Sequence, residues 1–167
     1  MTKGGGTVLS PFSTGVHHWT YEAVTIMTKG AYLLILDLHP GRTIQVGKLG
    51  KIDFPAGIYV YAGSALNGLE ARVGRHFSRA KRMRWHIDYL LAEGEARMAC
   101  IIPSEERLEC FLNRLVSTLP GSDVVATGFG SSDCVCSSHL HRITLSDLEI
   151  LMGIFGEELV LYPDSQG

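Results

Sequence analysis

The segment from residue 57 to residue 76, GIYVYAGSALNGLEARVGRH, holds phenol, guanidinium and imidazole groups at spacings that could support phosphate chemistry. Tyr59 and Tyr61 are two residues apart in a β-prone stretch, so their side chains would point to the same face of a strand. Arg72 and His76 follow where apolar residues recur at helical spacing, and they would lie one turn apart on one flank of that helix. The alternative for each tyrosine is packing in the core. The alternative for Arg72 and His76 is a place on the surface.

A basic run continues from this helix. Residues 72–86 contain no Asp or Glu, and His76 and His86 accompany six cations: Arg72, Arg75, Arg79, Lys81, Arg82 and Arg84. Cations gathered in this way bind backbone phosphates and release counterions, whereas the alternative is a solvated helix face. We predict that this run, together with Ser64, contacts nucleic acid, although the whole chain has a formal net charge of −2.

A second group of reactive side chains lies in the stretch DCVCSSHLH. It offers Cys134, Cys136, His139 and His141, and sulfur and imidazole ligands of this kind suit zinc. The Cys-x-Cys pair is tighter than the usual zinc spacing, so the alternative is a glycine-punctuated loop with reduced thiols. Both interpretations stay open at this point.

The order of these residues resembles the GIY-YIG nuclease superfamily. YVYAGSALNGLEARVGRHF is similar to the second half of its signature, with Tyr-x-Gly, a polar residue, a turn, and a helix carrying Arg and then His. With RWHIDYLL and GFGSSDCVCSSHL added, the pattern resembles the prokaryotic Uri-superfamily endonuclease group, long catalogued as a domain of unknown function. The resemblance covers most of the chain and implies a GIY-YIG-like fold. It also implies divalent-metal-dependent hydrolysis of phosphodiester bonds in DNA, with DNA repair as one setting.

The resemblance also decides which tyrosines matter. In this superfamily the two tyrosine words lie on different strands, but residues 57–59 and 61–63 share one strand. The counterpart of the first word is therefore GAY, at residues 30–32. This puts Tyr32 and Tyr61 on separate strands that could pair, and it leaves Tyr59 to pack in the core.

A phosphodiesterase also needs a metal ligand, because negative charge builds on the phosphate oxygens in the transition state. In GIY-YIG enzymes one glutamate on a later helix anchors a divalent cation, and the candidates here are Glu105, Glu106 and Glu109. The first two are explained as first-turn acids of a helix capped by Ser104. We therefore choose Glu109, whose segment ECFLNRL resembles the family's glutamate segment, and we place Glu105 second.

The resemblance implies a division of roles among these side chains. Glu109 would hold Mg²⁺ or Mn²⁺ against the scissile phosphate, and Tyr32, or a water that it positions, would deprotonate the nucleophile. Arg72 would stabilise the developing charge, while His76 and Tyr61 would orient water and phosphate. The competing interpretation is a catalytically inert nucleic-acid-binding or repair-accessory module of the same fold, and a third is a zinc-stabilised interaction domain.

These groups must be positioned by an α+β domain with a small, mostly antiparallel sheet flanked by helices. Residues 31–38 and 43–50 are predicted to form a hairpin, with further strands at 58–62, 97–103 and 157–163. Helices are predicted over 66–77, over 85–93 and after Ser104. Ser146 and Glu149 would form the capping box of a last helix.

The 167 residues suit one domain, which we place at 21–167 after a flexible segment at 1–20. No secretory signal or apolar run of membrane-spanning length is visible, so we expect a cytoplasmic, nucleoid-associated protein with reduced thiols. The expected partner is DNA in single-stranded, branched or damaged duplex form, with no membrane contact.

Overall fold

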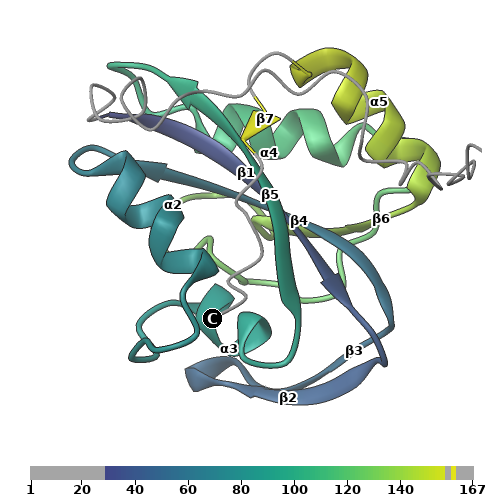
Figure 1. Ribbon diagram of the computed structural model, residues 1–167. Coiled ribbons are helices and arrows are strands. Elements are labelled where there is room, and N and C mark those ends of the chain that lie inside the picture. Colours follow the sequence, from purple (N-terminus) through teal and green to yellow (C-terminus); the bar gives the residue numbers. More distant parts are fainter. Residues whose placement is uncertain (1–28, 157–158, 161–167) are drawn as a thin grey trace, which may run out of the picture.

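The computed structural model describes residues 29–156 and the backbone of residues 159–160. Residues 1–28, including the predicted flexible segment, lie outside the described part. Figure 1 shows the elements in chain order. Their bounds are β1 Gly30–Leu38, β2 Arg42–Val46, a 3₁₀ turn Gly47–Leu49, β3 Gly50–Phe54, β4 Gly57–Ala65, α2 Leu69–Phe77, α3 His86–Leu91, β5 Glu95–Pro103, α4 Glu109–Ser117, β6 Leu140–Ile143, α5 Leu145–Phe155 and β7 Leu159–Val160.

The main sheet has five strands in the order β6-β4-β1-β5-β7, and every neighbouring pair is antiparallel. The prediction of an α+β domain with a mostly antiparallel sheet flanked by helices is confirmed. The central strand β1, GAYLLILDL, is apolar almost throughout because side chains on both of its faces are buried. None of the helices in the described residues is both long enough and apolar enough to cross a membrane.

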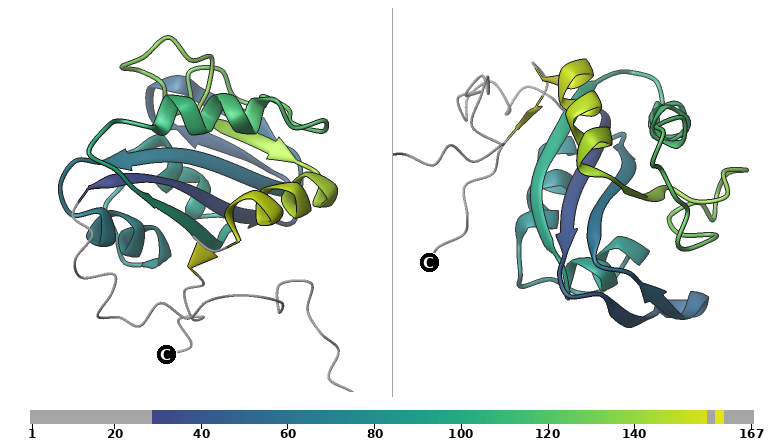
Figure 2. Two further views of the ribbon diagram at one scale, coloured as in Figure 1. Left: turned by 90° about the horizontal axis from the view of Figure 1, so that it is seen from above. Right: turned by 90° about the vertical axis from the view of Figure 1, so that its right-hand side faces the viewer.

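The two faces of the sheet carry separate cores. Tyr32, Leu34 and Leu36 of β1 pack with residues of α2 and α3 on one face. The alternate residues Leu33 and Ile35 pack against α4 and α5 on the other face. The left view of Figure 2 shows α4 and α2 on opposite sides of the sheet.

The predicted hairpin between residues 31–38 and 43–50 is wrong. β1 pairs with β4 and β5, while β2 and β3 pair with each other in a separate two-stranded sheet next to α3 (Figure 1). Because β1 is apolar on both faces, the energetically favourable place for it is the centre of the large sheet. The half-exposed strands β2 and β3 are left to pair locally.

Two helix starts also differ from the prediction. Helix α4 begins at Glu109 rather than after Ser104, whose hydroxyl instead accepts a hydrogen bond from the backbone N–H of Glu106 in a local turn. Helix α5 is capped by Thr144 and Asp147 rather than Ser146 and Glu149. The strand predicted at 157–163 is represented by β7, and the rest of that range lies outside the described residues.

Candidate active site

Tyr32 and Tyr61 lie on the neighbouring strands β1 and β4. In the antiparallel register Tyr32 is opposite Gly63 and Leu34 is opposite Tyr61, so the two tyrosines are diagonal neighbours on one face. Their ring centroids are 6.5 Å apart. A Cβ atom at Gly63 would lie 2.4 Å from the Oη and Cζ atoms of Tyr32. The glycine of the Tyr-x-Gly pattern is therefore needed because the Tyr32 ring lies directly against it.

Tyr59 is on the same strand as Tyr61 but has a different environment. It is fully buried, packs edge-on against Phe54 with ring centroids 6.1 Å apart, and donates a hydrogen bond of 2.6 Å to the carbonyl of Pro55. The expectation that Tyr59 packs in the core is confirmed.

Helix α2 brings Arg72 and His76 to the tyrosines. The Arg72 guanidinium donates to the carbonyl of Ser64 at 3.3 Å, and its Cζ lies 4.3 Å from the ring centroid of Trp85. His76 Nε2 is 2.7 Å from the Oη of Tyr32, and the imidazole is almost fully buried. His76 therefore contacts Tyr32 from behind and does not line the pocket described below.

Glu109 reaches the same region from the start of α4. The argument used to choose it is wrong, because α4 starts later than predicted and Glu109 itself occupies the first helical turn. Its position distinguishes it nevertheless. Glu105 is exposed and pairs with Lys29 at 3.0 Å, whereas the buried Oε2 of Glu109 has no hydrogen-bond partner among the described residues.

These side chains surround one pocket of about 320 Å³. Its lining includes residues 61–64 of β4, most of which lie beyond the stretch Ile58 to Tyr61 that pairs with the edge strand β6. The residues singled out from the sequence that line it are Tyr32, Tyr61, Ser64, Arg72, Arg84, His86, Glu109 and His139. Lining residues that sequence reasoning did not assign to a site are Trp85, Arg107, Gly130, Ser132 and Asp133. No local signal marks Arg107 or Asp133, because only the tertiary fold brings their loops to the pocket.

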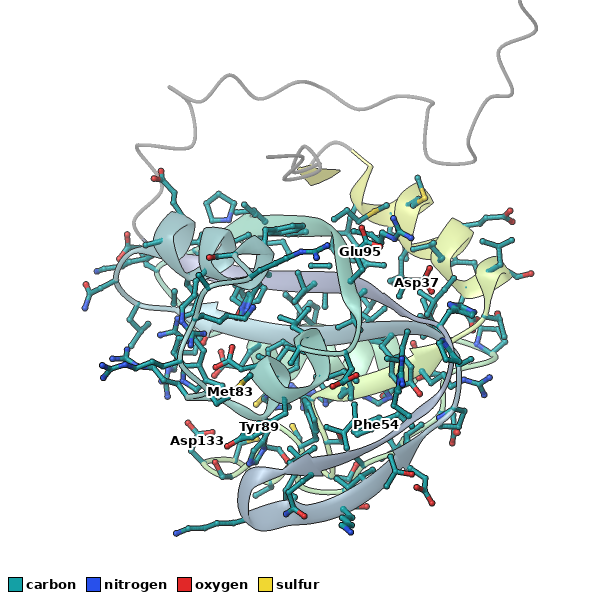
Figure 3. All side chains as sticks on the ribbon, turned by 60° about the horizontal axis from the view of Figure 1, so that its bottom comes forward. Asp37, Phe54, Met83, Tyr89, Glu95 and Asp133 are labelled. Carbon is teal, nitrogen blue, oxygen red and sulfur yellow. The ribbon has the colours of Figure 1, made fainter. Side chains whose placement is uncertain are left out.

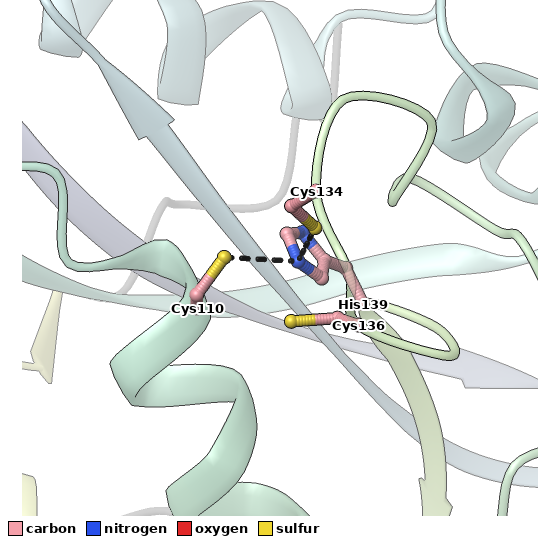
Figure 4. Close-up of side chains that lie close together, drawn as sticks. All are labelled: Cys110, Cys134, Cys136 and His139. Atoms are coloured by element: carbon pink, nitrogen blue, oxygen red, sulfur yellow. Dashed lines mark hydrogen bonds between the residues drawn. The ribbon is translucent and has the colours of Figure 1, made fainter.

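A cluster of sulfur and nitrogen atoms lies beside this pocket (Figure 4). It consists of Cys110 from α4 and Cys134, Cys136 and His139 from the loop before β6, and their ligand atoms all lie within 4.8 Å of one another. The group could hold a metal ion. The four cysteines of the chain, all within the described part, form no disulfide. With thiols this close, burial and then the neighbouring Cys136 and Cys134 raise the pKa of Cys110 to about 12.

The composition of this cluster differs from the set predicted from the sequence, because Cys110 is a member and His141 is not. Nε2 of His141 is 2.9 Å from Oδ1 of Asn113, and its Nδ1 is 3.0 Å from the hydroxyl of Ser122. His139 and His141 are two residues apart, but β6 begins between them at Leu140, and His141 is held by partners of its own. Both ring nitrogens of His141 are therefore already engaged.

Comparison with known proteins assigns the chain to a family. Residues 31–156, which include the pocket and the cluster, match the family described as Domain of unknown function DUF123. The chain belongs to this family. No curated protein and no solved structure matches the chain.

Burial in this DUF123 domain keeps the phenols of Tyr32 and Tyr61 protonated, and the imidazole of His76 behind the pocket neutral, near pH 7. Burial raises the pKa of Tyr32 well above its usual value, with Tyr61 adding to the effect and Arg72 opposing it. Burial also raises the pKa of Tyr61 to about 12. The pKa of His76 is lowered to about 3, first by burial and then by the charge of Lys81.

The basic run of the DUF123 domain divides into half-buried cations with partners inside the domain and exposed cations. Arg75 forms a two-pronged ion pair with Asp88, with contacts of 2.7 and 2.9 Å, and Lys81 donates to the carbonyls of Arg75 and His76. Arg79, Arg82 and Arg84 are exposed, and Arg84 also lines the pocket. In Figure 3, Met83 labels this run and Asp133 labels a loop that also lines the pocket.

Asp88 holds this run in place. Its side chain is fully buried, and besides Arg75 it accepts hydrogen bonds from the backbone N–H groups of Arg84 and Trp85 at 2.8 and 3.0 Å. Burial acts to raise the pKa of Asp88, but these hydrogen bonds and the Arg75 charge outweigh it and the pKa is lowered. His86 is held separately, because the backbone N–H of Gly130 donates to its Nδ1 at 3.0 Å.

Proposed function

We propose that this protein is a divalent-metal-dependent endonuclease of the GIY-YIG type, in the Uri-superfamily group, that hydrolyses phosphodiester bonds in DNA. The observation that carries the proposal is the convergence of Tyr32, Tyr61, Arg72 and Glu109, from four different elements, on a single pocket. A guanidinium and a carboxylate that can bind a metal ion are groups that can stabilise the charge built up in phosphodiester hydrolysis, and the phenols add hydrogen-bonding groups to the same cavity.

The cations of the pocket favour an anionic substrate. Arg72, Arg84 and Arg107 line it, and the exposed Arg79 and Arg82 extend the basic surface beyond it. Arg72 is held in place by the Ser64 carbonyl and the Trp85 ring, so little side-chain freedom is lost when it binds a phosphate. A fixed guanidinium can stabilise the charge that develops on the phosphate oxygens during hydrolysis.

Glu109 fits the role of metal ligand. Glu109 lines the pocket, its buried Oε2 has no hydrogen-bond partner in the described part of the chain, and carboxylate oxygens are the protein ligands that Mg²⁺ prefers. We propose that Glu109 holds Mg²⁺ or Mn²⁺, with water and substrate oxygens completing the coordination. When bound, the ion would neutralise charge on the scissile phosphate.

The hydrogen bond between Tyr32 and His76 fixes the orientation of the phenol at the pocket. A phenolate at Tyr32 is unfavourable at neutral pH, because burial raises the pKa of this phenol. We propose instead that Tyr32 stays protonated and that its phenol oxygen, held by Nε2 of His76 2.7 Å away, positions the attacking water. Tyr61 remains protonated and donates a hydrogen bond to the substrate.

A cleavage assay on a panel of labelled DNA molecules tests the proposal. Single-stranded, branched, lesion-containing and intact duplex DNA are incubated with the full-length protein and Mg²⁺ or Mn²⁺, alongside Glu109→Gln and Glu106→Gln. We expect metal-dependent cleavage of at least one substrate, reduced at least about 100-fold in Glu109→Gln because the ion contributes several kcal/mol. Glu106→Gln should cleave like the wild type. Equal activity of both variants would contradict the role of Glu109.

The pKa values in the pocket favour a second candidate, a catalytically inert nucleic-acid-binding or repair-accessory module. A phenol with a raised pKa beside an imidazole with a pKa of about 3 is a poor pair for moving a proton unless bound substrate changes their environment. Salt-dependent DNA binding without cleavage of any substrate in the panel would support this alternative.

A further inference from the structure

We propose that Cys110, Cys134, Cys136 and His139 form a structural zinc site that joins the start of α4 to the loop of residues 128–139. This assignment rests on the geometry of the four side chains and not on the proposed nuclease function. Figure 4 shows the three sulfur atoms and the imidazole directed toward a common point from two separate segments of the chain.

Two distances within the cluster match those of a metal site. In a tetrahedral site with ordinary zinc–sulfur and zinc–nitrogen bond lengths, the sulfur and nitrogen ligands are roughly 3.6 Å apart. The Nε2 of His139 lies 3.7 Å from the Sγ of Cys110 and 3.3 Å from the Sγ of Cys134. An imidazole nitrogen between two thiols at these separations has the spacing of ligands around one ion.

The backbone of the loop positions the side chains of Cys134, Cys136 and His139. The side chain of Val135 is fully exposed, whereas Cys134 and Cys136 on either side of it are partly buried and belong to the cluster. His139 is fixed on both sides, since its N–H donates to the carbonyl of Phe129 at 2.8 Å and its carbonyl accepts from Ala62 at 3.0 Å. The two thiols on either side of Val135 therefore point inward, and His139 is held at a fixed position beside them.

The loop has no regular secondary structure of its own. Residues 118–139, all of them described, form neither helix nor strand and make one isolated bridge at Asp123. Loops of this length without secondary structure are uncommon in small domains and need a source of order. Backbone hydrogen bonds and the buried Phe129 supply part of it. A metal ion bound at the end of the loop would add to it, because binding free energy at a structural site adds to folding free energy.

The chemistry of the ligands selects zinc. Thiolate and imidazole ligands bind zinc well, whereas Mg²⁺ and Ca²⁺ prefer oxygen. Four protein ligands complete a tetrahedron and leave no open position for a reacting water, which makes the site structural rather than catalytic. The site is therefore distinct in chemistry from the oxygen ligand Glu109.

The two sites are nevertheless coupled through the chain. Cys110 directly follows Glu109, and His139 lines the pocket together with Gly130, Ser132 and Asp133 of the same loop. Zinc would hold both walls of the pocket at a fixed separation. Loss of zinc should loosen residues 128–139 and Glu109 while leaving β1 and β4 in place.

Metal analysis of the full-length protein tests the assignment. The wild type, produced with zinc in the medium and purified without chelator, should contain about one equivalent of zinc per chain. Cys110→Ser and Cys136→Ser should lose most of it, whereas Cys100→Ala, a thiol in β5 outside the cluster, and His141→Gln should retain it. Cobalt substituted into the wild type should show the visible absorption of a tetrahedral thiolate site.

Several results would overturn the proposal. They are a wild-type protein that neither contains nor takes up zinc or cobalt, one that carries iron instead, and zinc that is retained in Cys110→Ser but lost in His141→Gln. Cobalt uptake by the wild type keeps the test decisive even if a serine variant fails to fold. Hydrogen exchange before and after zinc removal should increase in residues 128–139 and stay unchanged in β1, and unchanged exchange throughout would contradict the structural role.

The outcomes separate this proposal from the nuclease proposal. Zinc-loaded protein that cleaves no DNA would leave the zinc site standing and defeat the function. DNA cleavage by a wild-type protein that takes up neither zinc nor cobalt would defeat the zinc site and leave the nuclease function standing.

Discussion

The phenol oxygen of Tyr32 lies 2.7 Å from Nε2 of His76, and both side chains are at least 97 % buried, with relative exposures of 1 % and 3 %. The pair joins the central strand to helix α2 directly behind the pocket. Nδ1 of the same imidazole has no partner among the described residues, so the phenol is the ring's single polar contact there. Changes at either residue should therefore affect both stability and the chemistry proposed for the pocket.

Replacing Tyr32 with phenylalanine removes this hydrogen bond. The free energy of unfolding should fall by about 1–3 kcal/mol, because the buried imidazole is left without a partner. The variant should also lose DNA cleavage. The matched control is Tyr59→Phe, which loses one buried hydrogen bond to Pro55 but lies outside the pocket. Urea unfolding and the cleavage assay measure both effects, and an inactive Tyr59→Phe with an active Tyr32→Phe would contradict the assignment of the strands.

Substituting Gly63 with alanine tests the close approach of the Tyr32 ring. The new methyl group would meet the Tyr32 phenol at 2.4 Å, so the ring must move and the hydrogen bond to His76 should be disturbed. We expect a loss of about 1–3 kcal/mol in unfolding free energy and reduced cleavage. Gly74→Ala in α2 is the control, since nothing lies within 4 Å of its added Cβ, and it should gain up to about 1 kcal/mol.

Arg72 is expected to act on the substrate through its charge. Arg72→Ala should reduce cleavage by about 10²–10³-fold, the usual effect of removing one group that stabilises a transition-state charge. Arg72→Lys should recover only part of this loss, because an ammonium cannot keep the stacked, planar contact with Trp85. Arg114→Ala, an exposed arginine of α4 outside the pocket, should match the wild type in single-turnover cleavage.

The buried His76 should make the fold sensitive to acid. Its folded pKa of about 3 lies below the unfolded value of about 6.5, so only the unfolded chain is protonated at this residue between those values. Stability from this group is therefore complete above pH 6.5 and declines as the pH falls, by up to about 1.4 kcal/mol per pH unit. His76→Gln should show a smaller slope of unfolding free energy over this window, and an unchanged slope would contradict the neutral, buried state.

Asp88 should make the stability of the fold depend on pH in a more acidic range than His76 does. Its pKa is lowered in the folded protein, so its contribution is present above the unfolded value of about 3.9 and is lost as the pH falls through the folded value. Asp88→Asn should cost about 3–5 kcal/mol at pH 7, because Arg75 loses its buried partner. Chemical denaturation at pH 7 and pH 3 should show that the difference between variant and wild type shrinks on acidification.

Local patterns in the sequence determined the parts of this protein that depend on neighbours along the chain. The apolar run of β1, the Tyr-x-Gly of β4 and the helical spacing of α2 were visible without coordinates. The resemblance to the GIY-YIG superfamily then singled out Tyr32, Tyr61 and Arg72, which line the pocket. Strand alternation and helical periodicity arise from backbone geometry within a few residues, which is why they can be recognised in a single sequence.

Only the tertiary structure decided which distant segments meet. Two histidines two residues apart look equivalent in the sequence, but His139 lies in the cluster with Cys110, 29 residues earlier, while His141 bonds to Asn113. The late start of α4, the separate pairing of β2 with β3 and the arrival of Arg107 at the pocket have the same origin. Each depends on which apolar faces can be buried against one another across the whole domain, and that competition leaves no signature within a short stretch of chain.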